Sequence, residues 1–286
     1  QDILEMLDNV LQKFIDNAPD HIARAKFSAM RERSIGVGAL GFHAYLQKKG
    51  MPWESALAKS ANIRMFRHIR KGLDEANKRL GKERGEAPDA KGSGLRCSHV
   101  MAVAPNASSS IIMGNTSPSI EPWRANAYRQ DTLSGAFLNK NKYLDKLLKS
   151  KCDENPKLDY DKTWSSIIAN DGSVQHLTCL ADYEKDIYKT AMEIDQRWVI
   201  EHAADRQVYI DQSQSLNVFF RPDANISYIH AVHFLAWKKQ LKTMYYCRSE
   251  KIGKADRVSK KIERQIIQEI DMSAIAAGEE CLACEG

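Results

Sequence analysis

The chain has 286 residues, enough for one large domain or two ordinary ones, and its 43% hydrophobic and 28% charged residues are typical of soluble globular proteins. No apolar run approaches the roughly 20 residues of a membrane helix, so no helical membrane segment is predicted. The net charge of +5 is dispersed, and we expect no direct binding to nucleic acid. Its densest stretch, 248–264, mixes both signs, which fits a solvated connector or a weak attraction for phosphate-bearing ligands.

The start of the chain is predicted to be helical. The first twenty residues are charged and amphipathic, unlike a signal peptide, and the leucines of 3–15 share one helical face. Asp20 is expected to cap a second helix that runs to about Arg33. Because the first residue is Gln1 rather than Met, we expect a processed or partial product with sequence missing upstream.

Helices and short apolar runs alternate along the rest of the chain. A long amphipathic helix is predicted from Glu54 to a stop at Gly81, Gly85 and Pro88. Continuous apolar runs bounded by polar residues predict strands buried on both faces, as in parallel sheets. The predicted strands are 100–104, 215–220 and 243–247; the later predicted helices are 187–210 and 226–240; surface helices and loops are predicted over 139–162. This alternation favours an α/β fold with a largely parallel sheet.

The last residues and the cysteines suggest how the chain is organised. After about Gln265 one short apolar stretch is followed by small and acidic residues, so we divide the chain into a globular part, 1–265, and a flexible tail, 266–286. Four cysteines occur singly, which is typical of a reducing compartment and predicts a cytoplasmic protein. One of them, Cys152, precedes two acids in a strongly charged stretch, which we interpret as surface.

Three glycines, Gly36, Gly38 and Gly41, match the G-x-G-x-x-G pattern of dinucleotide-binding turns. That fingerprint needs a buried strand before it, and the residues before it here, 31–34, are Arg-Glu-Arg-Ser. We therefore favour close backbone packing, which glycine permits because it lacks a Cβ.

A phosphate site is one of two interpretations of the stretch after the predicted strand 100–104. Asn106-Ala-Ser-Ser109 would begin a helix there, where N–H groups without internal partners, the helix dipole and the serine hydroxyls favour a phosphate or diphosphate. The alternative is a capped helix whose serines bond to its own first turn.

Cys281-Leu-Ala-Cys284 lies almost at the end of the sequence. Half of a zinc site would need two more suitably spaced ligands, and the sequence has no second C-x-x-C. A thioredoxin-like motif should follow a strand and open a helix. A dithiol on a flexible tether, carrying two reducing equivalents to a disulfide elsewhere, is the third interpretation.

The tyrosine doublet, Tyr245 and Tyr246, ends the run Leu241-Lys-Thr-Met-Tyr-Tyr. Most such pairs pack, with an apolar ring and a hydrogen-bonded hydroxyl. A phenol can also lose an electron together with a proton, so two touching tyrosines could pass on a radical.

Taken together and in this order, these motifs resemble the carboxy-terminal part of the large (alpha) subunit of class I (Ia) ribonucleotide reductase, most closely the versions of tailed phages. The resemblance covers most of the chain from about Arg33. The stretches that carry it are Ser34-Ile-Gly-Val-Gly-Ala-Leu-Gly-Phe42, Ala104-Pro-Asn-Ala-Ser-Ser-Ser110, Asn115-Thr-Ser-Pro-Ser-Ile-Glu-Pro122, Asp211-Gln-Ser-Gln-Ser-Leu-Asn217 and Leu241-Lys-Thr-Met-Tyr-Tyr246.

The resemblance implies the later strands of a ten-stranded α/β barrel with surrounding helices. It implies that Asn106, Ala107, Ser108 and Ser109 hold the diphosphate of a ribonucleoside diphosphate substrate. It implies that the tyrosine doublet relays a radical made by the metal cofactor of a separate small (beta) subunit. It further implies that Cys281 and Cys284 re-reduce an active-site disulfide and are recharged by thioredoxin or glutaredoxin. No cofactor or metal would be bound by this chain directly.

One part of the family pattern is absent from this sequence. The thiyl-radical cysteine of the family sits in an Asn-x-Cys-x-Glu loop upstream of the phosphate turn, and the only cysteine before Asn106 is Cys97, followed by Ser-His. The sequence therefore predicts part of a split or partial subunit, inactive in deoxyribonucleotide synthesis without an upstream half and the small subunit. The alternative is a non-catalytic nucleotide-binding or scaffold remnant of a reductase.

Overall fold

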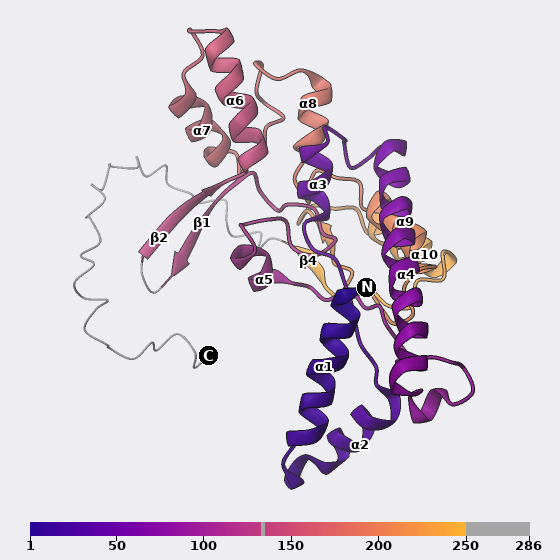
Figure 1. Ribbon diagram of the computed structural model, residues 1–286. Coiled ribbons are helices and arrows are strands. Elements are labelled where there is room, and N and C mark those ends of the chain that lie inside the picture. Colours follow the sequence, from indigo (N-terminus) through magenta and orange to yellow (C-terminus); the bar gives the residue numbers. More distant parts are fainter. Residues whose placement is uncertain (133–134, 250–286) are drawn as a thin grey trace, which may run out of the picture.

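The computed structural model describes residues 1–132 and 135–249 (Figure 1). The helices are α1 (Asp2–Asn17), α2 (Ala23–Glu32), α3 (Phe42–Lys48), α4 (Ala56–Arg84), α5 (Ala107–Ile112), α6 (Lys142–Glu154), α7 (Tyr160–Ala169), α8 (Asp182–Ile187), α9 (Gln196–Gln207) and α10 (Ile226–Lys238), with 3-10 turns at Asp20–Ile22 and Pro88–Ala90. The strands are β1 (Ala127–Thr132), β2 (Gly135–Lys140), β3 (Val218–Phe220) and β4 (Cys247–Ser249). None of the helices in these residues is both long enough and apolar enough to span a membrane.

Four extended segments lie side by side in chain order and run parallel to one another. Val37 pairs with Met101, Val103 pairs with Gln214, and β3 pairs with β4. Backbone hydrogen bonds continue the pattern between these pairs, for example from the Ser215 N–H to the Val103 carbonyl at 2.8 Å. The prediction of an α/β fold with a parallel sheet is confirmed.

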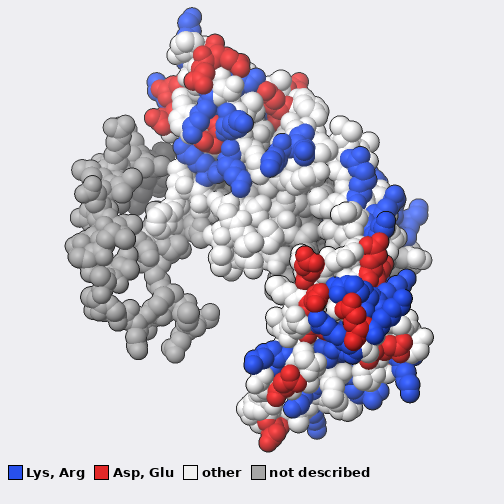
Figure 2. Space-filling view, in the orientation of Figure 1, with Lys and Arg blue, Asp and Glu red and all other residues white. Residues whose placement is uncertain are grey.

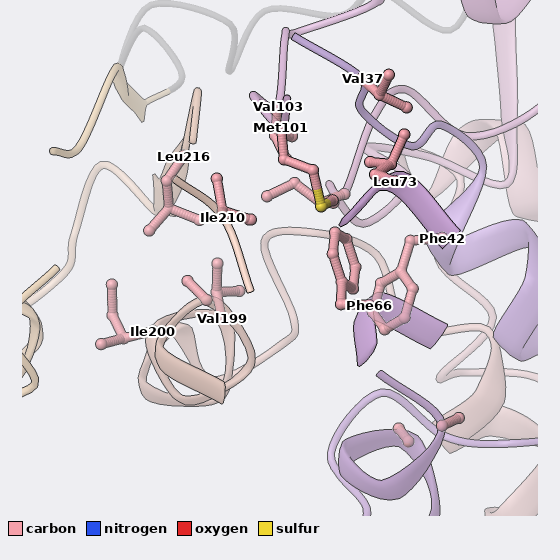
Figure 3. Close-up of a cluster of buried hydrophobic side chains, with 14 of the residues drawn as sticks. Val37, Phe42, Phe66, Leu73, Met101, Val103, Val199, Ile200, Ile210 and Leu216 are labelled. Carbon is pink, nitrogen blue, oxygen red and sulfur yellow. The ribbon is translucent and has the colours of Figure 1, made fainter. Parts of the chain in front are cut away.

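The main hydrophobic core lies between this sheet and the long helices (Figure 3). Met101 and Leu216 extend from the sheet, while Phe66 comes from α4 and Val199 and Ile200 come from α9. All five side chains are at most 2% exposed. The alternation of buried strands and amphipathic helices in the sequence thus produces one continuous core.

A second, smaller core forms a lobe around α6 and α7. Leu144 and Leu148 of α6 pack there with Trp164 and Ile167 of α7. An antiparallel hairpin, β1 with β2, leads into this lobe, and Figure 1 shows it projecting from the base of α6. The predicted surface helices over 139–162 are confirmed, whereas the hairpin was not predicted.

Glycines allow backbones to approach closely at two places. A Cβ at Gly36 would lie 2.9 Å from the Cβ of Ala102, and one at Gly38 would lie 2.6 Å from the Ala102 carbonyl oxygen. The packing interpretation of the G-x-G-x-x-G stretch is therefore confirmed. The predicted helix stop is confirmed at Gly85, which caps the end of α4 after Arg84, whereas Gly81 lies within the helix. A Cβ at Gly81 would lie 2.2 Å from the Gly94 carbonyl oxygen.

Two other predicted helices differ from the structure at their starts. The predicted helix 187–210 is wrong in its first third, because 188–195 is an irregular segment and α9 begins only at Gln196, capped by Asp195. The segment contains buried apolar residues, which imitate a helical pattern. Asp20 does not cap α2 but begins a 3-10 turn, and α2 has no side-chain cap.

A buried ionic cluster joins α1 to the ends of α2 and α4. Asp8 of α1 is 1% exposed. It accepts hydrogen bonds from Arg33 at 2.6 Å, from Arg84 at 2.9 Å and from Arg96 at 3.1 Å. Burial opposes ionisation of Asp8, but the hydrogen bonds from Arg33 and Arg84 and the nearby positive charges outweigh it and lower its pKa. The cluster therefore fixes α1 to the ends of α2 and α4.

Candidate functional site

The chain enters α5 through a sharp turn at Asn106. The φ angle of Asn106 is +50°, in the left-handed region, and its side chain makes no capping hydrogen bond. Ser108 and Ser109 are exposed, whereas Ser110 is buried and its hydroxyl donates to the Ala107 carbonyl at 2.8 Å. Because the first N–H groups of a helix lack partners within it, this uncapped turn offers hydrogen-bond donors next to two exposed hydroxyls.

A pocket of about 530 Å³ opens beside this turn. The start of α5 forms one wall, the segment 116–125 forms another, and the ends of the parallel sheet close it. The lining residues are Pro105, Ala107, Ser110, Ile111, Thr116, Pro118, Glu121, Trp123, Arg124, Ala125, Tyr128, Asn217 and Arg248. Two arginines and the open helix turn make this pocket suitable for an anionic ligand.

The pocket also contains a buried acid, Glu121, which is 8% exposed. Its Oε1 accepts a hydrogen bond from the Asn217 side-chain amide at 2.5 Å. Burial raises the pKa of Glu121 to about 7, although the charges of Arg248 and Arg124 and the Asn217 hydrogen bond act in the opposite direction. Glu121 therefore changes its charge near neutral pH.

The tyrosine doublet lies next to this pocket: Tyr246 contacts Asn217 and Arg248, which line it, and Tyr245 lines a neighbouring pocket that shares Pro105 with it. The two rings are in contact, with centroids 4.2 Å apart and planes inclined by 53°. A side-chain hydrogen bond with Tyr246 raises the pKa of Tyr245. Arg248, which lines the pocket, places its guanidinium over the ring of Tyr246 at 4.8 Å from the centroid. The doublet thus has direct ring contact, and the ring of Tyr246 is also covered by a guanidinium.

The predicted buried strand 243–247 is wrong in its bounds and its burial. The strand β4 begins at Cys247, and Tyr245 and Tyr246 are 52% and 49% exposed. Apolar and aromatic residue types alone suggested burial, but these rings form part of a surface. Figure 2 shows that surface charges crowd around α1, α2 and α4, while the middle of the same face, over α5, has few.

The structure places the predicted phosphate turn in the wall of the pocket and the tyrosine doublet against two residues that line it, and it adds residues that the sequence did not single out as site residues. These are Glu121, Arg124, Asn217 and Arg248. A signal for two of them exists: Glu121 follows Ile120, and Asn217 sits between Leu216 and Val218. A polar residue within an apolar run is expected to be buried, and a buried polar group needs a hydrogen-bond partner.

Four of the six cysteines lie within the residues that the structure describes. Cys281 and Cys284 lie outside the described residues. Cys97 is buried, and burial raises its pKa to about 12. Cys152 is half-buried near the exposed end of α6, and burial also raises its pKa, so neither thiol is activated. Among residues 1–132 and 135–249, no group of three His, Cys, Asp or Glu side chains could hold a metal ion.

Comparison with known proteins gives consistent matches. The family described as "Ribonucleotide reductase, barrel domain" matches residues 1–93 and 88–247. The ribonucleoside-diphosphate reductase large subunit of Invertebrate iridescent virus 6 is 54% identical over 261 residues, which are 91% of this chain and 27% of that protein. The protein of the same name from Caenorhabditis elegans is 33% identical over 326 aligned positions, covering 100% of this chain and 40% of that protein.

A solved structure supports the same assignment. The alpha subunit of Actinobacillus ureae class Id ribonucleotide reductase has a TM-score of 0.79 and 38% identity, over 87% of this chain and 45% of that one. The chain spans less than half the length of these relatives. The likeness to tailed-phage versions stays a prediction. The fold, the matched residues and the relatives agree, and the chain belongs to the ribonucleotide reductase large-subunit family, of whose barrel domain it forms a part.

Proposed function

We propose that this chain supplies part of the active site of a ribonucleoside-diphosphate reductase, which converts ribonucleoside diphosphates to deoxyribonucleoside diphosphates for DNA synthesis. The observation that carries the proposal is the arrangement of three features around one pocket. The uncapped turn of α5 and two arginines line it, and a tyrosine doublet with touching rings contacts its lining residues Asn217 and Arg248.

The substrate diphosphate would bind at the start of α5. The backbone N–H groups of Ala107, Ser108 and Ser109 would donate to phosphate oxygens, and the exposed hydroxyls of the two serines would add further hydrogen bonds. Arg124 and Arg248 line the same pocket and supply positive charge. Asn106 would shape the turn through its left-handed backbone rather than through its side chain.

The tyrosine doublet would carry the radical. When the partner small subunit removes an electron and a proton from one phenol, the second phenol can return an electron and a proton to the first. The unpaired electron then moves by one residue and no electron is gained or lost. Contact between the rings, with centroids 4.2 Å apart, favours both transfers.

The remaining steps depend on other segments and partners. An upstream half of the large subunit would supply the cysteine that the doublet oxidises. Cys281 and Cys284 would become a disulfide as they reduce the active-site disulfide, and thioredoxin or glutaredoxin would reduce them again. The radical itself would come from the metal cofactor of the small subunit, in a reducing, cytoplasmic compartment.

A tyrosine replacement tests the relay. Tyr246→Phe keeps the ring but removes the hydroxyl, and phenylalanine is far harder to oxidise. In a complex of this chain with the upstream half and the small subunit, we expect turnover to fall by at least about a thousandfold, several kcal/mol of barrier. Tyr183→Phe is the matched control, because Tyr183 is also half-exposed, at 55%, on the α8 side of the molecule.

The same comparison separates the enzyme from a scaffold. A non-catalytic remnant would tolerate Tyr246→Phe as well as Tyr183→Phe. Equal turnover or equal assembly in both variants would therefore reject the relay.

A binding measurement tests the phosphate turn without the partners. Equilibrium dialysis of the full chain should detect a ribonucleoside diphosphate more strongly than the matching ribonucleoside. Ser109→Asp should weaken diphosphate binding about tenfold or more, because it puts a negative charge at the start of α5. Ser165→Asp, at an exposed serine of α7, is the control. Equal binding by both variants would reject a diphosphate site at this turn.

A further inference from the structure

The backbone around the tyrosine doublet departs from regular parallel pairing. The Tyr245 N–H donates to the Leu216 carbonyl at 2.8 Å, and the Val218 N–H donates to the Tyr246 carbonyl at 3.0 Å. In a regular parallel pair, both of these bonds would belong to one residue opposite Asn217. Here two tyrosines stand opposite one asparagine, which is the arrangement of a β-bulge.

The bulge explains how two neighbouring tyrosines can touch. Successive side chains of a regular strand point to opposite faces of the sheet, so adjacent rings would be separated. An extra residue re-aims one of the side chains. The rings of Tyr245 and Tyr246 consequently approach to 4.2 Å between centroids.

The extra residue leaves one backbone donor without a partner in the sheet, the N–H of Tyr246. The Asn217 side chain takes this role, and its Oδ1 accepts the Tyr246 N–H at 3.0 Å. The other end of the same amide donates to Glu121 at 2.5 Å. Asn217 is only 1% exposed, so its amide is fixed at both ends in a buried position.

We propose that Glu121 and Asn217 are positioning residues, which hold the bulge and thereby keep the two tyrosine rings in contact. Glu121 orients the Asn217 amide so that its oxygen faces the Tyr246 N–H, and Arg248 holds the Tyr246 ring from its face. The importance of this geometry for turnover rests on the proposed radical relay, whereas the geometry itself can be tested without it.

An exchange of donor and acceptor provides the sharpest test. Asn217→Asp keeps an acceptor for the Tyr246 N–H but sets two carboxylates against each other. Near pH 6 one proton can be shared between them; by about pH 8 repulsion should open the bulge. The double variant Glu121→Gln with Asn217→Asp has the charge of the wild type and restores a donor opposite an acceptor.

The charged surroundings of Glu121 are the same in all variants. Arg124 and Arg248 act on it through their charge, and Tyr128 lines the same pocket. A change in pH dependence between variants therefore reports on the exchanged pair.

Amide hydrogen exchange of Tyr246 in the full chain is the first measurement. Asn217→Ala should speed this exchange about tenfold, the effect of one lost hydrogen bond. Asn217→Asp should speed it only at the higher pH, beyond the ordinary dependence of exchange on pH, and the double variant should restore the wild-type rate. Asn77→Ala is the matched control, because Asn77 is also buried, at 4% exposure, and bonds to Cys97 at both ends of its amide.

Turnover of the complex with the upstream half and the small subunit is the second measurement. Asn217→Asp should lose turnover as pH rises from about 6 to about 8, and the double variant should regain most of it. Asn77→Ala should leave the pH profile of turnover unchanged. This control separates the exchanged pair from a general loss of stability.

The outcomes separate this inference from the proposed function. Wild-type exchange of Tyr246 in Asn217→Ala, or no recovery in the double variant, would overturn the positioning role. Faster exchange with unchanged turnover would also overturn it, while leaving the relay intact. Unchanged turnover in Tyr246→Phe would overturn the relay, and with it the functional part of this inference.

Discussion

Two buried carboxylates in this molecule are surrounded by arginines, yet their ionisation is shifted in opposite directions. Asp8 is held by direct hydrogen bonds from three arginines, and its pKa is lowered. Glu121 receives its hydrogen bond from Asn217, while Arg248 and Arg124 act through their charge, and burial raises its pKa to about 7.

The difference shows how one set of residue types can build a structural clamp or a site. Where arginines contact the carboxylate, they compensate for the loss of water and fix three helices together. Where they line a pocket instead, they act on the acid only through their charge, and its burial is only partly compensated. The first arrangement should stabilise the fold, and the second should reduce stability in favour of function.

Removing the Asp8 charge should have the largest effect on stability. Asp8→Asn keeps the shape of the side chain but leaves the buried Arg33, and its neighbours, without a counter-charge. We expect a loss of about 3–5 kcal/mol in the free energy of unfolding, measured with urea. Asp2→Asn, at an exposed position of the same helix, is the control and should change it by less than about 0.5 kcal/mol. Similar small losses in both variants would reject the clamp.

Ionisation of Glu121 should lower the free energy of unfolding, whereas ionisation of Asp8 raises it. Its pKa rises from 4.5 to about 7 on folding, so its contribution to stability is fully present below pH 4.5 and is lost as the pH rises to about 7. Relative to Glu121→Gln, which does not titrate, the wild type should lose about 3 kcal/mol of unfolding free energy across this range. Thermal or urea unfolding of both proteins at several pH values measures the difference. If the unfolding free energies of the two proteins changed with pH in parallel, the cost of burying the Glu121 charge would be fully compensated by its neighbours.

The contrast between the two carboxylates also shows what sequence reasoning could reach. The alternation of apolar runs and amphipathic helices predicted the parallel α/β fold, because burial on both faces leaves a continuous apolar pattern. The turn at Asn106 and the tyrosine doublet could be found because their residue types have a chemistry of their own.

Other features depend on distant partners and were therefore missed. Nothing local separates Asp8 from the other acids of α1, since its arginines come from three later segments. The exposure of the tyrosine doublet also escaped prediction, because a bulge opposite Asn217 has no signal in residue type. The start of the helix predicted over 187–210 was wrong for a similar reason, because burial of the irregular segment 188–195 produced an apolar pattern.

A second ion cluster, in which one lysine lies between two acids, allows a test of whether burial or direct contact makes the Asp8 cluster strongly stabilising. Lys59 of α4 lies 3.0 Å from Glu201 and 3.3 Å from Asp205 of α9, but its side chain is 30% exposed. The contacts are as direct as those of Asp8, whereas water still reaches the charges. If burial decides, Lys59→Gln should cost only about 0.5–1 kcal/mol of unfolding free energy, and added salt should reduce that loss. Lys48→Gln, at an exposed lysine of α3, serves as the control. A loss as large as that of Asp8→Asn, unchanged by salt, would show instead that direct contact alone makes such a cluster strong.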